Sequence, residues 1–237
     1  MQKYGILVLA LLGFAGHCHK SGLEPASKIF QLAVVDTSGN VLSTIDVPAD
    51  NYTYAIIRAH TDSSVIDTTT AFSFTTDNGS FSTGGTSASS KIDIHGNAYA
   101  YLKSKAVLNA HVQATVGGNY SQYITIPFTT SYPDTLYLNL PDSATDDLAG
   151  RITFTTTLYK YFGSISPGLA VVFNATTAAG ASIGTFTHVL PSDTTGTVNA
   201  EYWLDNATYT GFIYINAYLV TSTKDSIKTS GMMLITH

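Results

Sequence analysis

The sequence is poor in charged residues and in the residue types that favour helices. Only 11% of the 237 residues are Asp, Glu, Lys or Arg. Thr, Ser and Gly are plentiful, and the chain contains 15 Tyr. Helices favour Glu, Lys, Leu and Ala, while strands and turns favour the residues that are abundant in this chain. The composition therefore predicts short strands joined by turns. The net charge of −5, without a basic cluster, argues against a nucleic-acid partner.

Long apolar runs are also missing, apart from one near the N-terminus. Lys3 is followed by an uncharged, mostly apolar run over residues 5–15. This run is too short to span the roughly 30 Å of bilayer hydrocarbon, but it has the length of a signal-peptide core. We therefore expect residues 1–17 to be a signal peptide and the protein to be exported.

Cysteine occurs once, at Cys18, shortly after that run. A lone thiol in an exported chain has no intramolecular partner. The position of Cys18 resembles that of the modified cysteine of a bacterial lipoprotein, although His17 precedes it where a small residue is usual. The resemblance implies lipidation of Cys18 and a lipidated tether over residues 18–27 that the lipid anchors to the membrane. It also implies a location in the cell envelope, at the outer membrane or cell surface. Ordinary cleavage near Ala15, which would leave Cys18 as an incidental thiol, is the alternative.

A unit of three strands occurs twice in the chain. In the first copy, residues 91–128, apolar and polar side chains alternate as they do in half-buried strands, and a Gly-Gly pair marks a turn. A weaker copy begins at Gly196, 100 positions after Gly96. The repeat predicts two domains, over residues 28–130 and 131–237.

We expect each domain to be an antiparallel β-sandwich. The strands expected in the first domain cover residues 29–35, 41–47, 54–59, 71–75, 80–82, 97–102, 112–116 and 123–128. The strands expected in the second cover residues 136–140, 152–156, 171–173, 184–186, 198–204, 213–219 and 230–235. Residues 82–90 should form a loop and residues 159–168 an insertion. Because the junction at 129–133 is short, the two sandwiches should lie end to end with limited relative motion.

Four segments of the first domain carry a recognisable pattern: VPAD at 47–50, FSFTTDNGSF at 72–81, DIHGNA at 93–98 and VQATV at 112–116. They resemble the bacterial Ig-like domain of the invasin and intimin type (group 1). That family has a V-P-A-D-G-like start, an F-T-T-x-x-G-x-F hairpin, and D-x-x-G-x-A and V-x-A-x-V strands; here Asn51 stands in place of the first glycine. The resemblance implies an all-β chain of two tandem Ig-like antiparallel β-sandwiches that interacts with a protein or cell-surface partner.

The side chains that catalysis requires do not fall into a known motif. The sequence has no G-x-S-x-G elbow, no H-E-x-x-H pair and no Gly-rich phosphate loop ahead of a helix. The seven histidines are scattered, and His95 and His111 are expected in a turn and on the polar face of a strand. We therefore expect a non-enzymatic protein without a cofactor.

The most suggestive acidic group consists of Asp142, Asp146 and Asp147. Ca²⁺ takes about six to eight oxygen ligands, largely from carboxylates and carbonyls. These residues are candidates for a calcium site, but their spacing lacks the D-x-D-x-D-G pattern of a calcium loop. A polar loop after Pro141 is the simpler interpretation, and we expect no metal.

Five aromatic residues are candidates for ligand binding because the strand alternation directs them outward: Tyr99, Tyr101, Trp203, Tyr214 and Tyr218. Exposed aromatic rows can stack on sugar rings or anchor a protein interface. Tyrosine is also favoured on strand surfaces for its β-propensity and cross-strand packing alone. We expect the tyrosines of the two domains to lie on different sheets.

The sequence leaves three functional readings. The first is an envelope-anchored, non-enzymatic Ig-like lipoprotein that serves in cell-surface interaction (adhesion), and the second is a structural or accessory module of the envelope. The alternative is a small glycan-binding surface lipoprotein that uses its exposed aromatic residues. An exposed apolar patch on one sheet would favour the first reading, a uniformly polar surface the second, and an aromatic cleft the third.

Overall fold

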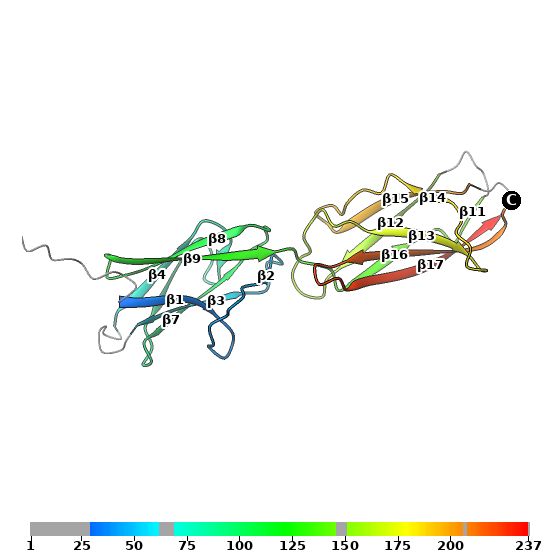
Figure 1. The fold of residues 1–237 in the computed structure, drawn as a ribbon. Helices are drawn as coiled ribbons and strands as arrows, with labels where there is room; N and C mark the ends of the chain where they lie inside the picture. The colour runs from blue at the N-terminus through cyan, green and yellow to red at the C-terminus, as the bar shows by residue number, and fades with distance from the viewer. Residues whose placement is uncertain (1–28, 62–68, 146–150, 206–207, 237) are drawn as a thin grey trace, which may run out of the picture.

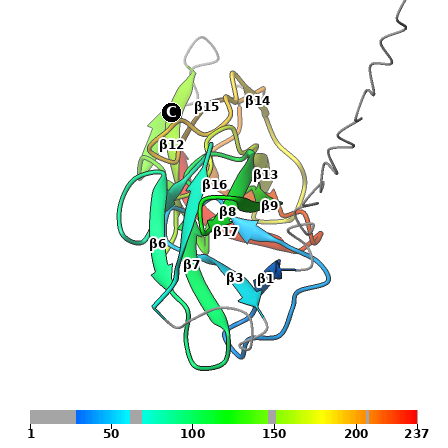
Figure 2. The ribbon, with the colours of Figure 1, turned by 90° about the vertical axis from the view of Figure 1, so that its left-hand side faces the viewer.

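The computed structural model describes residues 29–61, 69–145, 151–205 and 208–236. In these ranges the chain forms four sheets that pack as two β-sandwiches, and the sandwiches lie end to end (Figure 1). Seen along the long axis of the molecule, the first sandwich lies in front of the second (Figure 2). The expected all-β fold of two tandem antiparallel sandwiches is confirmed.

The first sandwich consists of a four-stranded and a five-stranded sheet. The four-stranded sheet has the order β1 (Phe30–Val35), β3 (Ala55–Thr61), β7 (Asn97–Lys103), β5 (Ser80–Phe81). The five-stranded sheet has the order β2 (Val47–Pro48), β9 (Tyr120–Thr129), β8 (Asn109–Val116), β4 (Ala71–Thr76), β6 (Ser87–Lys91). Strand β2 pairs with β9 in parallel, and the other pairs are antiparallel.

The second sandwich repeats this arrangement in two four-stranded sheets. One has the order β10 (Thr135–Asn139), β12 (Ile152–Tyr159), β15 (Thr197–Trp203), β14 (Thr185–Thr187). The other has the order β11 (Ser143–Thr145), β17 (Ser226–Thr236), β16 (Gly211–Val220), β13 (Val172–Thr177). Again the first strand of the second sheet pairs in parallel, β11 with β17. The same sheet orders in both halves confirm the repeat read from the sequence.

Each core is built from the inward-facing residues, which occupy alternate positions along the strands. In the first sandwich, Phe72 and Phe74 are fully buried, and the Phe30 ring packs edge-on against Phe72 with the ring centroids 4.9 Å apart. In the second, Ile213 and Ile215 of β16 are fully buried opposite Tyr202 of β15. Burial of such side chains contributes about 1.5–3 kcal/mol each relative to exposure.

Three strand predictions differ from the structure. Residues 41–47 do not form one strand: Val41 makes a single bridge to Val35, and only Val47, at the other end, pairs as part of β2. The segment 82–90 is not wholly a loop, since β6 pairs with β4. Strand β11 was not expected at all. Strands β6 and β11 lie at sheet edges and consist mostly of small polar residues, so they lack the apolar alternation that marks a strand.

The turns before β7 and β15 show the repeat at the level of single hydrogen bonds. Asp93 Oδ1 accepts hydrogen bonds from the N–H groups of His95 and Asn97, each at 2.8 Å. Asp193 Oδ1 accepts them from Thr195 and Thr197, at 2.8 and 2.9 Å. Asp is favoured in turns because its side chain bonds the following N–H groups in this way.

A hydrogen-bonded contact, which we call the clasp, joins the two sandwiches. The insertion between β12 and β13 contacts the turn after β2: Ser164 donates to the Asp50 carbonyl oxygen from its N–H at 2.7 Å and from its hydroxyl at 3.1 Å. In the linker, the buried Ser131 donates its hydroxyl to the Ser164 carbonyl at 2.8 Å and its N–H to Ser166 Oγ at 2.9 Å. The clasp therefore connects the first domain, the linker and the second domain.

Local structure on both sides prepares the clasp. The buried Asp50 carboxylate accepts hydrogen bonds from the N–H groups of Tyr52 and Thr53 and from the Thr53 hydroxyl, at 2.7–2.8 Å, which fixes the turn. Opposite it, Gly163 has φ +80°, and a Cβ there would lie 2.5 Å from the Asp50 oxygen. Only glycine allows this backbone conformation and this close approach together.

Candidate functional site

The five aromatic candidates lie on three different sheets, each directed away from the core. Tyr99 and Tyr101 are on the outer face of β7, Trp203 is on β15, and Tyr214 and Tyr218 are on β16. Tyr101, Trp203 and Tyr214 are exposed, and the other two are half-buried. The expected outward direction is confirmed, but the structure does not bring the five residues into one site.

The acidic candidates and the cysteine lie wholly or partly outside the described residues. Asp142 is exposed, and its carbonyl oxygen accepts a hydrogen bond from Leu234 N–H at 3.0 Å. Asp146, Asp147 and Cys18 fall in ranges that the structure does not describe. Among the described residues, no group of three or more His, Cys, Asp or Glu side chains could hold a metal ion, and no helix is long and apolar enough to cross a membrane.

One sheet of the second sandwich presents a partly apolar outer surface, which we call the β16 face. Strand register places Val172, Tyr218 and Lys228 in one row across β13, β16 and β17. The next rows are Asn174, Asn216 and Ser230, then Thr176, Tyr214 and Met232, and Phe212 beside Leu234. Val172, Phe212, Tyr214 and Met232 are each 40–51% exposed.

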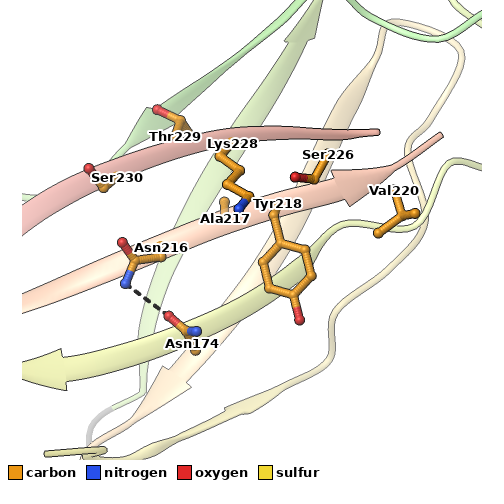
Figure 3. Close-up of a pocket in the computed structure, with 9 residues that line it drawn as sticks. All are labelled: Asn174, Asn216, Ala217, Tyr218, Val220, Ser226, Lys228, Thr229 and Ser230. Atoms are coloured by element: carbon orange, nitrogen blue, oxygen red, sulfur yellow. Dashed lines mark hydrogen bonds between the residues drawn. The ribbon is translucent and has the colours of Figure 1, made fainter. Parts of the chain in front are cut away.

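A shallow groove of about 650 Å³ crosses one part of the β16 face. Among the residues that line it, Asn216 Nδ2 donates a hydrogen bond to Asn174 Oδ1 at 2.9 Å (Figure 3). The Tyr218 ring and the Lys228 side chain project from the neighbouring strands on the same side of the sheet (Figure 3). The groove thus combines an aromatic ring, paired amides and one cation, and the described residues that line it include no carboxylate.

A second surface, the aromatic strip, crosses the junction between the sandwiches. Seven of the eleven exposed aromatic side chains of the described residues belong to it: Tyr101, Tyr54, Tyr52, Phe162, Tyr161, Tyr159 and Tyr137. The Tyr52 and Phe162 rings stack at the clasp, with their centroids 5.4 Å apart.

Ring contacts continue the strip on both sides of that stack. In the first domain, Tyr54 meets Tyr101 edge-on at 6.4 Å, and Lys103 Nζ lies 5.5 Å from the centre of the Tyr54 ring. In the second, Tyr159 meets Tyr161 at 5.5 Å and Tyr137 at 5.9 Å. The strip therefore consists of three groups of contacting rings, to which both domains contribute. Along the chain, Tyr52 lies two residues from Tyr54, and Tyr161 directly precedes Phe162.

A groove of about 680 Å³ lies on the outer face of the β10–β12–β15 sheet, which also carries Tyr137. We call it the amide groove, since its lining includes Asn139, Asn199, Thr153 and Thr155. Among the described residues that line it, the one carboxylate, Glu201, is paired: Arg151 Nη1 and His188 Nδ1 each lie 2.8 Å from Glu201 Oε2. The hydrogen bond from Arg151, with the charge of His188, lowers the pKa of Glu201.

Comparison with known proteins identifies the fold. The sequence matches no protein-family model and no curated protein. Among solved structures, that of invasin, "a bacterial integrin-binding protein", is similar with a TM-score of 0.51 and 20% identity, over 84% of this chain and 38% of that chain. The Yersinia pseudotuberculosis adhesin InvE gives a TM-score of 0.48 and 12% identity, over 87% of this chain and 60% of that chain.

The architecture is thus a tandem pair of Ig-like β-sandwiches. More narrowly, the domains have the fold of the invasin-type Ig-like domains, as the four sequence segments implied. This chain spans less than two thirds of the length of either matched structure.

Proposed function

We propose that the protein is a non-enzymatic, envelope-anchored Ig-like protein that serves in adhesion by binding a protein partner through the β16 face. The main support for this proposal is a difference between the outward residues of two equivalent strands, β8 and β16. Strand β8 occupies in the first sandwich the place of β16, and its outward residues His111, Gln113 and Thr115 are polar. Strand β16 presents Phe212 and Tyr214 at its outward positions. The fold therefore does not require these exposed rings.

The chemistry of the β16 face suits a protein partner. Exposed apolar patches mark interaction sites, and the centres of interfaces are enriched in aromatic residues and Met and depleted in charge. Phe212, Tyr214 and Met232 have this composition, and Lys228 is the one charged residue in the four rows described above. The fold is shared with invasin, a bacterial integrin-binding protein, and this similarity supports a protein partner.

Adhesion can be tested with beads that carry the mature protein and with cultured cells as the target. We expect wild-type beads to adhere, protease treatment of the cells to abolish adhesion, and the variant Phe212→Ser/Met232→Ser to reduce it at least about tenfold, since hot-spot truncations cost roughly 2 kcal/mol or more. Tyr123→Ala, which removes a 70% exposed ring from β9, is the matched control and should adhere like wild type. Equal adhesion of the double variant and wild type would remove the β16 face from the proposal.

The envelope anchor rests on Cys18 and is tested separately. Wild type and Cys18→Ala, each with an epitope after His237, are fractionated, and intact cells are treated with protease. The proposal expects the wild type in the membrane fraction and cleaved on intact cells, and the variant released. Protection of the wild type would place it in the periplasm as an accessory module, and two soluble proteins would show that Cys18 is no anchor.

A further inference from the structure

We propose that the aromatic strip and the amide groove together form a binding site for a linear, uncharged polysaccharide. This function lies beyond the proposed protein contact, because it uses a different sheet of the second domain and the outer face of the first. The residues that carry it are the seven rings of the strip, with Asn139 and Asn199 in the groove.

The geometry of the strip suits a long, thin ligand. Its rings form three groups, with ring centroids 5.4–6.4 Å apart in each contacting pair, and the groups follow one another across the junction of the two sandwiches. The stack of Tyr52 on Phe162 lies beside the hydrogen bonds from Ser164 to the Asp50 carbonyl, so the clasp holds the two halves of the row in fixed register. Because the junction is fixed, one polysaccharide chain can contact the rings of both domains at the same time.

The chemistry of the two surfaces matches sugar rather than an apolar protein face. Aromatic rings offer apolar faces to the C–H groups of a pyranose ring, and a tyrosine adds a hydroxyl at its edge. The amide groove adds Asn and Thr side chains, which can both donate hydrogen bonds to sugar hydroxyls and accept them. An aromatic platform with a few convergent polar groups is the composition of a small-ligand site.

The charged groups on these surfaces have partners within the protein, which favours an uncharged ligand. Glu201 is paired with Arg151 and His188 at the amide groove. Beside the strip, Lys103 lies over the Tyr54 ring and Lys160 donates a hydrogen bond to the Tyr132 carbonyl. Neither surface gathers the cations that an acidic polysaccharide would need.

Affinity electrophoresis of the purified mature protein tests the proposal, in native gels that contain xylan, glucomannan, galactomannan or hydroxyethylcellulose. We expect retardation by at least one of these, weakened roughly two- to tenfold by Tyr101→Ala and by Tyr137→Ala, from an aromatic contact energy of about 0.5–1.5 kcal/mol. These two rings come from different domains and lie away from the clasp, so their loss leaves the junction intact. Tyr123→Ala and Tyr214→Ala remove exposed rings elsewhere and should migrate like wild type.

Chain length gives a second readout. A long polysaccharide engages both halves of the strip, so it should bind more tightly than its own short oligosaccharides, and Tyr101→Ala should reduce this advantage. Three results would overturn the proposal: no retardation by any of the four polymers, retardation unchanged in both strip variants, or retardation only by the acidic polymers alginate and dextran sulfate. None of them bears on adhesion through the β16 face, which has its own variant.

Discussion

The carbonyl oxygen of Asp50 in the first domain accepts two hydrogen bonds from Ser164 in the second, from its N–H at 2.7 Å and its hydroxyl at 3.1 Å. The turn that presents this oxygen is itself fixed by the Asp50 carboxylate. Interfaces between domains of one chain usually permit relative motion unless they are large and hydrophobic. Here directional hydrogen bonds on both sides of the short linker restrict that motion, so the two sandwiches should behave as one rod.

We predict that Gly163→Ala opens this junction. A Cβ at residue 163 would lie 2.5 Å from the Asp50 oxygen and 2.8 Å from Tyr52 Cβ, so the contact must separate. Small-angle X-ray scattering should show a broader distribution of domain orientations than in the wild type. Calorimetry should show the unfolding transitions of the two domains moving apart, because each domain loses its contact with the other.

Gly168→Ala is the matched control for this change. Gly168 has φ +83°, close to the +80° of Gly163, but nothing lies within 4 Å of its added Cβ. Both variants therefore carry the same backbone strain of roughly 1–2 kcal/mol, and only one has the clash. If the two variants scatter alike, the clasp does not fix the domains.

Sequence periodicity predicted the strands that line the cores but not the surfaces that join the domains. Alternation over β7 and β16 follows from one buried and one exposed face, so Tyr101 and Tyr214 could be assigned outward from the sequence. Tyr52 and Phe162 lie in irregular segments more than 100 positions apart, where no period operates. Their stack arises only when the domains dock.

Local hydrogen bonding explains why the sequence motifs predict the turn at Asp93 but not the edge strand β6. The D-x-x-G pattern at Asp93 predicted its turn because the side chain bonds N–H groups two and four residues later. Asp193, 100 positions after Asp93, accepts the matching hydrogen bonds in the second domain. Edge strand β6, with the sequence SASSK, gave no signal, since its pairing partner β4 rather than its own residues determines that it is a strand.

We predict that Phe72→Ala destabilises the first domain by about 3–5 kcal/mol, the usual cost of removing a buried ring. Phe72 is fully buried, and its ring contacts both Phe30 and Phe74, at 4.9 and 6.2 Å between centroids. Urea denaturation measures the change in the free energy of unfolding, and calorimetry provides an independent measurement. Tyr123→Ala, in the same sandwich but on its surface, should change stability by less than about 0.5 kcal/mol. A loss below about 1 kcal/mol for Phe72→Ala would contradict the packing described.

The turn aspartates predict how stability depends on pH. Burial opposes ionisation of Asp93, but hydrogen bonds from the N–H groups of Asn97 and His95 outweigh it and lower the pKa of this carboxyl. The N–H of Thr197 and the hydroxyl of Thr195 lower the pKa of Asp193. A carboxyl whose pKa is lower in the folded state stabilises the fold fully above its unfolded pKa of about 3.9, and loses that contribution as pH falls through the folded pKa.

The variant Asp93→Asn/Asp193→Asn keeps an oxygen acceptor in each turn and removes the titrating charge. We expect it to be less stable than the wild type at pH 7, because a neutral amide accepts weaker hydrogen bonds than a carboxylate. The difference should shrink below about pH 4 as the wild-type carboxyls take up protons. Urea midpoints for both proteins at pH 7 and at about pH 2.5 measure this. A stability difference that stays constant across that range would mean that the charge of the two carboxylates does not stabilise the turns.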